Sequence, residues 1–146
     1  NIITSLELDP AEMEKRNIHL QKKYAEIEEN EVRFEELHCE DAEYLIVAFG
    51  SCARIAQKAM EIAREEGIKV GLLRPITLWP FPSKAIAARA AQVKGILTVE
   101  LNAGQMVEDV RLAVECKVPV EHFGRLGGIV PDPDEVITAL KEKLIK

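Results

Sequence analysis

With 146 residues, of which 47% are apolar and 30% charged, the chain has the length and composition of one soluble globular domain. Its net charge is −6, and residues 1–43 hold 13 acidic but only 5 basic side chains, which argues against a nucleic-acid-binding face. No apolar run approaches the roughly 18 residues of a membrane span, and no secretory signal is recognisable. We therefore expect a cytoplasmic protein without membrane attachment. Because the sequence begins with Asn1, we expect a processed chain or a piece of a longer one.

The three cysteines, Cys39, Cys52 and Cys116, are far apart and form no CxxC pair. This usage favours a reduced compartment, and it excludes a zinc or iron–sulfur site built from cysteines of this chain alone. The histidines are equally scattered, and no two of them lie at a spacing typical of metal ligands.

The first predicted element is a long helix from Pro10 to about Glu29, after an extended lead-in over residues 1–8. Asp9 is its expected cap, Pro10 takes the first helical position, and Glu12 is expected to bond back to the cap amide. Its apolar stripe is narrow, so we interpret it as a linker that lies across the domain or against a missing neighbour. Its acidic surface predicts a solvated face, the alternative being a docking site for a basic partner. We place the linker at residues 1–31 and the domain at residues 32–146.

Five strands are predicted after the linker. The central one is Tyr44–Ser51, whose six successive apolar residues indicate a strand covered on both faces of a parallel sheet. Ile68–Arg74 and Gly95–Asn102 repeat this pattern. Alternation in Val32–His38 and Val118–Phe123 is typical of half-exposed edge strands.

Four helices are predicted between and after these strands. The first follows Ser51 as its expected cap, presents a face of small residues and ends at Gly67. The others start near Ser83, at Met106 and after Asp132, which opens an Asp-Pro-Asp-Glu capping sequence. Helices that alternate with strands predict an α/β fold, a three-layer α/β/α sandwich with a five-stranded mixed sheet.

The loop Arg74–Pro82 contains three prolines in its last eight residues, so it forms no regular element. Leu78, Trp79 and Phe81 place apolar bulk on it. We expect it to pack on its own domain. The alternative is an interface loop, because aromatic side chains on a rigid backbone are good anchors.

Ligands of open α/β sheets bind beyond the carboxyl ends of the strands, where the strand order reverses. Three turns are expected there, and their helix N-terminal amides could hold an anion with the help of an arginine. The candidate interface or ligand residues are Ser51, Asn102, Gly104, Gln105, Gly124, Arg125, Gly127 and Gly128. Each also has an ordinary structural interpretation: Ser51 as a helix cap, Asn102 and Gln105 as turn formers, Arg125 in a salt bridge, and the glycines as backbone requirements.

Known catalytic motifs are missing from the sequence. It has no GxGxxG, no GxxxxGK[ST] and no GxSxG. It also lacks a Gly-Asp-Gly that could hold the metal and diphosphate of thiamine diphosphate, and no acid–base pair can be selected. We therefore predict no catalytic residue and no metal ligand in this chain.

The combination of three segments is specific. They read LIVAFGSCARIAQKAMEIAREEGIKVGLLRPITLWPFP, GILTVELNAGQMVEDVRLAV and FGRLGG, the last followed by a Pro-x-Pro. Together they resemble the C-terminal domain of the thiamine-enzyme subunit of 2-oxoacid:ferredoxin oxidoreductases, most closely the 2-ketoisovalerate (3-methyl-2-oxobutanoate) type. The resemblance covers nearly the whole chain.

This resemblance implies a transketolase C-terminal-like sheet of order 1-3-2-4-5 with strand 1 antiparallel. It also implies that the whole enzyme uses thiamine diphosphate, Mg, an iron–sulfur cluster and coenzyme A, and that it passes electrons to ferredoxin. The cofactor-binding domains would lie before Asn1 and on another subunit, so none of these cofactors is expected to bind this fragment. Its implied role is assembly with the other subunits and closure near the active site, with no catalysis of its own.

Two alternatives remain open. The glycine-rich crevice could make the chain a binding module for a small anion or coenzyme A. A flavodoxin-like electron carrier is disfavoured, because the turn Gly50–Ala53 is not the Ser/Thr-rich loop that such a carrier uses.

Overall fold

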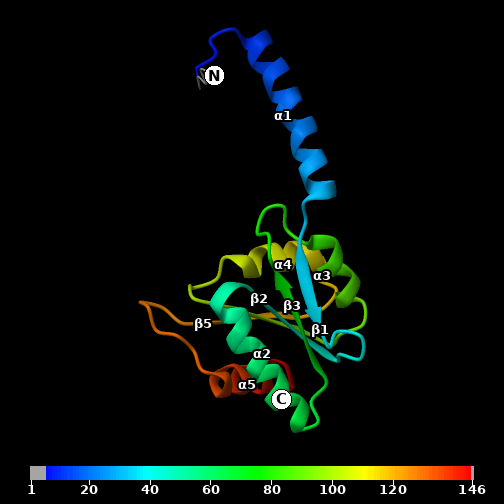
Figure 1. Cartoon of the computed structure of the whole chain (residues 1–146), viewed down its shortest axis with the longest axis vertical. Coiled ribbons are helices and arrows are strands. Elements are labelled where there is room, and N and C mark those ends of the chain that lie inside the picture. Colours follow the sequence, from blue (N-terminus) through cyan, green and yellow to red (C-terminus); the bar gives the residue numbers. More distant parts are fainter. Residues whose placement is uncertain (1–5, 146) are drawn as a thin grey trace.

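The computed structural model describes residues 6–145, so the first five residues of the expected lead-in lie outside the described part of the chain. The described residues fold into a layered α/β domain with one helix projecting from it (Figure 1). The elements are α1 (Pro10–Asn30), β1 (Phe34–Leu37), β2 (Tyr44–Ala48), α2 (Gly50–Glu65), β3 (Val70–Pro75), α3 (Ser83–Ala90), β4 (Ile96–Glu100), α4 (Met106–Val114), β5 (Val120–Gly124), α5 (Pro133–Leu140) and the π-helical turn η1 (Lys141–Ile145).

The sheet has the order β1-β3-β2-β4-β5, which confirms the predicted topology. β1 runs antiparallel to β3, and the other three pairs are parallel. β2 is central, and its residues from Leu45 to Ala48 are fully buried, as the unbroken apolar run predicted. β1 and β5 are the edges, in agreement with their alternating sequences.

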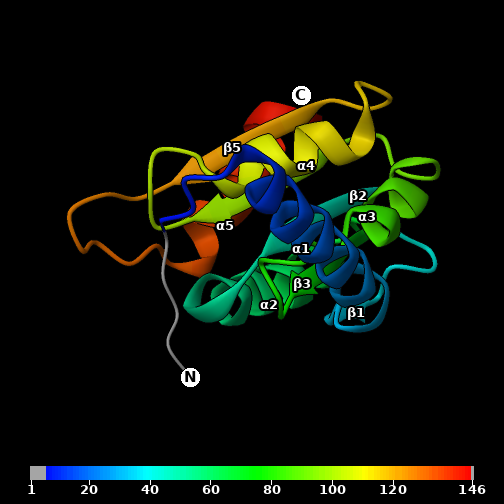
Figure 2. The same ribbon diagram turned by 90° about the horizontal axis from the view of Figure 1, so that it is seen from above.

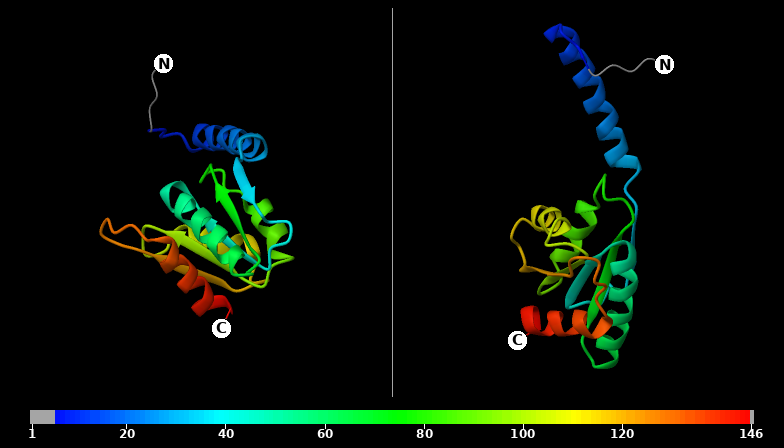
Figure 3. Two further views of the ribbon diagram at one scale, coloured as in Figure 1. Left: turned by 60° about the horizontal axis from the view of Figure 1, so that its bottom comes forward. Right: turned by 90° about the vertical axis from the view of Figure 1, so that its left-hand side faces the viewer.

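Two helices cover each face of the sheet (Figure 3). On one face, α2 and α5 pack on β2, β3 and β4 through a cluster that includes Ala56, Ala59 and Leu140. The small side chains of α2 let its backbone approach the sheet closely. On the other face, α3 and α4 enclose a second cluster around Leu45 and Ile86. The three-layer sandwich is therefore confirmed.

The start of α2 differs from the expectation. The helix begins at Gly50, its cap position is Phe49, and no side chain bonds to its first amides. Ser51 is exposed within the first turn, so its expected role as the helix cap is wrong. The predicted end is confirmed, because Gly67 adopts a φ of +86° just beyond the last turn.

The two Asp-Pro helix starts also differ from each other. At α5, the Asp132 carboxylate accepts from the Glu135 amide at 2.8 Å, and Glu135 accepts from the Asp132 amide at 3.2 Å, which is the expected capping box. At α1, the Asp9 carboxylate accepts from the amide of residue 11 at 2.8 Å. Among the described residues Glu12 does not complete that box, because its carboxylate pairs with Lys15.

Helix α1 extends away from the sandwich, and none of its residues is buried (Figures 1 and 3). Of the two predicted positions of this helix, the one across its own domain is not observed, and the one against a missing neighbour stays a prediction. At its C-terminal end, the Tyr24 ring meets the Trp79 ring edge-to-face, with 5.6 Å between the ring centroids.

The proline-rich loop after β3 divides into a packed and an exposed part. Phe81 packs against the core cluster under α3 and α4, which confirms the expectation of a loop packed on its domain. Ile76, Leu78 and Trp79 remain about half exposed, at 49%, 48% and 54%. An interface role for these three side chains stays a prediction.

Candidate functional site

The turns after β2, β4 and β5 lie at one edge of the sheet, because these strands are parallel and in register. Ala48 is opposite Val99, and Glu100 is opposite Gly124. In Figure 2 the turn after β4 and the long loop after β5 extend to the same side of the molecule. This carboxyl edge is where the sequence placed the candidate residues.

The most buried charged group of this edge is Glu100, the last residue of β4, which is 1% exposed. Its carboxylate accepts three backbone hydrogen bonds from the start of α4. Oε2 accepts from the amides of Gln105 at 3.2 Å and Met106 at 2.8 Å. Oε1 accepts from the amide of Val107 at 3.0 Å. Glu100 therefore caps α4 from inside the domain, and its charge is favourable at the positive end of the helix.

His122 of β5 lies beside this carboxylate. Its Nδ1 is 3.3 Å from Glu100 Oε1 and 3.3 Å from Thr98 Oγ1. Its Nε2 is 3.3 Å from the backbone oxygen of Asn102. The Asn102 side chain in turn accepts from the Gly104 amide at 2.7 Å, so the polar groups of this turn bond to one another.

Three of the candidate residues are brought together here. A methyl group on Gly124 would lie 2.2 Å from the Asn102 backbone oxygen and 2.7 Å from His122 Nε2. A methyl group on Gly104 would lie 3.7 Å from the same His122 ring. The β4–α4 turn therefore packs closely on β5, and this packing leaves little room for a larger side chain at Gly104 or Gly124, beside Asn102.

The other candidates do not join this cluster through their side chains. The guanidinium of Arg125 pairs with Glu135 at 2.8 Å, which is the ordinary salt-bridge interpretation. Gln105 and Ser51 are exposed. Gly127 and Gly128 lie on the exposed loop, and a methyl group on either would meet nothing within 4 Å.

At α2 no side chain of the described residues bonds to the first amides, so binding of an anion at that turn stays a prediction. The first amides of α4, in contrast, are not free to hold an external anion. The carboxylate of Glu100 already accepts from the first amides of this helix. Sequence reasoning missed Glu100, although one signal was present: an acidic residue ends an apolar strand six residues before a helix whose preceding residue, Gln105, is a poor cap.

The perturbed titratable groups near the sheet do not supply a nucleophile. Burial raises the pKa of the Cys39 thiol to about 11, and burial together with the Glu100 carboxylate raises the pKa of Cys52. Both thiols therefore stay protonated near neutral pH. Hydrogen bonds from Arg89 hold the pKa of Glu36 below its usual value, which fits a structural ion pair on β1.

To hold one of the metals that the resemblance implies, the described residues would need a group of ligating side chains. Across residues 6–145, no group of three or more His, Cys, Asp or Glu side chains is placed to hold a metal ion. A cavity of about 380 Å³ beside β5 and α5 is lined by four carboxylates and one cation, Lys143, so its lining is acidic on balance. Over the same residues, no helix is both long and apolar enough to span a membrane.

Comparison with known proteins gives consistent matches. The family model described as pyruvate:ferredoxin oxidoreductase core domain II matches residues 42–136. The ketoisovalerate oxidoreductase subunit VorB of Methanothermobacter marburgensis is 46% identical over 142 residues, which cover 97% of this chain and 40% of VorB.

Two solved structures share the fold. A 2-oxoglutarate:ferredoxin oxidoreductase from Magnetococcus marinus, with 2-oxoglutarate, coenzyme A and succinyl-CoA bound, superposes with a TM-score of 0.80 at 25% identity, over 93% of this chain and 24% of that one. A split-gene transketolase, an inactive β4 tetramer, gives a TM-score of 0.66 at 20% identity over 77% of this chain and 41% of its own.

The chain thus spans about two fifths of the length of the curated relative that it matches. The family model covers well over half of the chain, including β2 to β5 and the carboxyl edge. By sequence and by fold, this chain belongs to the pyruvate:ferredoxin oxidoreductase core domain II family.

Proposed function

We propose that this chain is the C-terminal, transketolase-like domain of one subunit of a cytoplasmic 2-oxoacid:ferredoxin oxidoreductase. The observation that carries the proposal is the 46% identity to a ketoisovalerate oxidoreductase subunit over 97% of the chain. The whole enzyme would oxidatively decarboxylate a branched-chain 2-oxoacid, transfer the acyl group to coenzyme A and reduce ferredoxin. Thiamine diphosphate, Mg and the iron–sulfur cluster would be bound by other domains and subunits.

The role of this domain is assembly and closure near the active site. The described residues supply no metal cluster, and the pKa values of the buried thiols Cys39 and Cys52 are raised. Glu100 occupies the first amides of α4, whereas the loop after β5 is exposed at the same edge. Leu126, Ile129 and Val130 on that loop are 58%, 52% and 61% exposed, and such a protruding apolar group is typical of a contact with another protein. We assign residues 1–31 to a linker and residues 32–146 to the domain.

The degree of likeness supports a proposal for the substrate class. The ketoisovalerate-type VorB subunits are 46% and 49% identical over 97% of the chain, whereas a 2-oxoglutarate synthase subunit KorA is 34% identical over 69% of it. The proposal is therefore a branched-chain 2-oxoacid. The alternative of a coenzyme A or anion module finds less support, because the α4 amides are already bonded and the cavity beside α5 is acidic.

The test has two parts. The purified 146-residue chain is expected to show no ketoisovalerate-dependent ferredoxin reduction and no calorimetric binding of thiamine diphosphate. The complex of all subunits is expected to turn ketoisovalerate over. Turnover or thiamine diphosphate binding by the chain alone would contradict an assembly role, and saturable binding of coenzyme A to the chain would support the alternative.

The contact loop is tested by co-purification with the subunit that carries a Gly-Asp-Gly motif. Ile129→Asp is expected to weaken recovery, because it places a charge in an apolar contact. Arg125→Ala is expected to weaken it less, by releasing the loop from Glu135. Leu112→Asp is the matched control, because Leu112 is 76% exposed on α4 and lies outside the loop. Equal recovery of all three variants would remove the loop from the proposed interface.

A further inference from the structure

Helix α1 has 21 residues and buries none of them. Most of the stability of a protein helix comes from packing one face of it on neighbouring structure. Met13, Leu20 and Tyr24 follow at intervals of seven and four residues, so they share one face of the helix. We therefore expect this exposed apolar face of α1 to pack against another protein surface.

The apolar face continues onto the domain at its base. The Tyr24 ring meets the Trp79 ring at an interplanar angle of 84°. The Trp79 loop is tied to the residues that follow α1, because the amides of Ile76 and Thr77 both donate to the Arg33 carbonyl, at 2.9 and 3.1 Å. We define the α1–Trp79 surface as Met13, Leu20, Tyr24, Ile76, Leu78 and Trp79.

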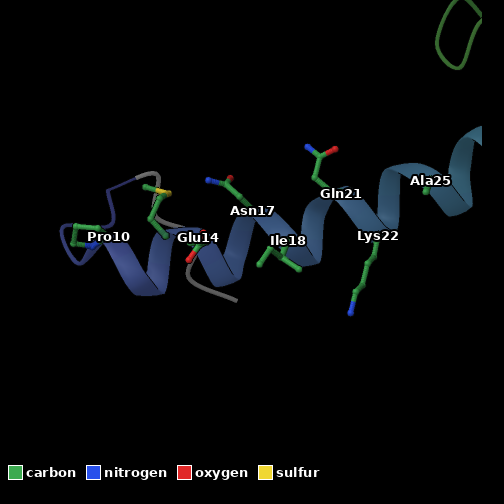
Figure 4. Close-up of a pocket in the computed structure, with 8 residues that line it drawn as sticks. Pro10, Glu14, Asn17, Ile18, Gln21, Lys22 and Ala25 are labelled. Carbon is green, nitrogen blue, oxygen red and sulfur yellow. The ribbon is translucent and has the colours of Figure 1, made fainter.

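A shallow groove adjoins this surface along α1 (Figure 4). It shares Met13 with the surface and includes Ile18, which is 52% exposed. In Figure 4, Asn17 and Gln21 point to one side of the helix, whereas Ile18 and Lys22 point to the other. The groove is thus an open side of a helix, which suits a protein surface better than an enclosed small molecule.

Charge argues against a second copy of this chain as the occupant. An antiparallel pair of α1 helices centred on Leu20 would place Glu12 opposite Glu28 and Glu14 opposite Glu26, and like charges in such positions repel. Residues 6–31 hold eight carboxylates and four basic side chains. The complementary surface therefore has an apolar centre and a basic rim.

The length of the relatives indicates which protein segment covers the α1–Trp79 surface. The match to VorB includes nearly all of this chain, yet it covers 40% of VorB. The rest of such a subunit would be covalently linked to α1, and its effective concentration at the helix would be far above that of a separate protein. We propose that the α1–Trp79 surface docks on the part of its own subunit that lies outside this chain. The inference rests on the proposed function, because it takes the chain to be one part of such a subunit.

Hydrogen–deuterium exchange of the longer subunit, purified without the other subunits, tests this docking. The amides of residues 14–30 are expected to exchange at least ~100-fold more slowly than unprotected amides, as for a helix held by tertiary contacts. Exchange near the unprotected rate would overturn the inference. Protection that arises only after the other subunits are added would also overturn it, because the occupant would then be another subunit.

Paired variants show whether the defined surface is responsible. Leu20→Glu and Tyr24→Glu are expected to lose at least ~10-fold of the protection, and Leu112→Glu on α4 is expected to lose none. Glu28→Lys is expected to weaken the protection, because the new positive charge would repel the basic rim of the complementary surface. Glu108→Lys is its control. Unchanged protection in the surface variants would overturn the inference.

The two proposals fail in different ways. If α1 is unprotected in the longer subunit while the complex assembles and turns over ketoisovalerate, the docking fails and the proposed function stands. If α1 is protected but the subunit joins no complex and supports no turnover, the proposed function fails.

Discussion

Replacing Glu100 with Gln removes the charge that caps α4 while keeping the size of the side chain. The carboxylate is 1% exposed and accepts from three backbone amides. A glutamine has one carbonyl oxygen, so it can keep the two bonds from Gln105 and Met106 only by turning its NH2 group toward the Val107 amide and His122. One amide donor of the helix is then left buried without an acceptor.

The expected loss can be worked out from these bonds. Leaving the Val107 amide unsatisfied costs about 1–3 kcal/mol. The two remaining bonds change from charged to neutral acceptors and weaken by about 0.5–1 kcal/mol each. Removing a buried charge offsets part of this. We therefore expect Glu100→Gln to lower the free energy of unfolding by about 2–4 kcal/mol, a large part of the ~5–15 kcal/mol of a typical domain.

Urea unfolding followed by circular dichroism measures this loss, and the melting temperature is expected to fall by about 5–15 °C. Glu108→Gln is the matched control, because Glu108 is exposed in the first turn of the same helix, and its change should stay below about 1 kcal/mol. A loss below about 0.5 kcal/mol for Glu100→Gln would show that the three bonds contribute little and would refute the internal cap.

Arg89→Met is expected to cost about 1–2 kcal/mol near pH 7, because it removes the hydrogen bonds that hold the pKa of Glu36 below its usual value. A lowered pKa contributes stability above the pKa of the unfolded chain, and this contribution is lost as the pH falls through the lowered pKa of Glu36. The difference between parent and variant should therefore shrink in urea titrations taken at decreasing pH; a constant difference would contradict the ion pair. Cys116 is the exposed thiol, so a thiol reagent should label one site in the native chain and three after unfolding, and native labelling should disappear in Cys116→Ser. Gly124→Ala places a methyl group 2.2 Å from the Asn102 carbonyl, and we expect a loss of about 1–3 kcal/mol in urea unfolding; a neutral substitution would show that the turn can move.

Local patterns in the sequence were sufficient for the elements of the fold. The unbroken apolar run of β2 predicted a strand buried on both faces, and Asp132 with Glu135 predicted the capping box of α5. These signals are contained in neighbouring residues, which is why they can be read without a structure. The strand order came from the family resemblance, because periodicity says which segments are strands and not which strands are neighbours.

The candidate site was harder to predict, because its bonds join residues across a turn. In the sequence, Glu100 is only the polar residue that ends a strand. Its carboxylate reaches the α4 amides because the chain reverses direction after it. Ser51 shows the opposite error: its position after a strand is typical of a cap, but the cap position of α2 is Phe49, two residues earlier. A shift of two residues at a helix start is within the usual uncertainty of element boundaries, yet it decides which side chain can cap.

Trp79, the one tryptophan of the sequence, is 54% exposed at the base of α1. Cys116, the exposed thiol, lies on the turn after α4. These two positions form a built-in donor and acceptor pair for resonance energy transfer once an acceptor dye is attached to the thiol. Any binding partner that moves the Trp79 loop relative to the sandwich would change the transfer efficiency, and one that only shields the indole would change its emission maximum. The native sequence therefore already carries a spectroscopic reporter that separates rearrangement of the loop from its simple coverage.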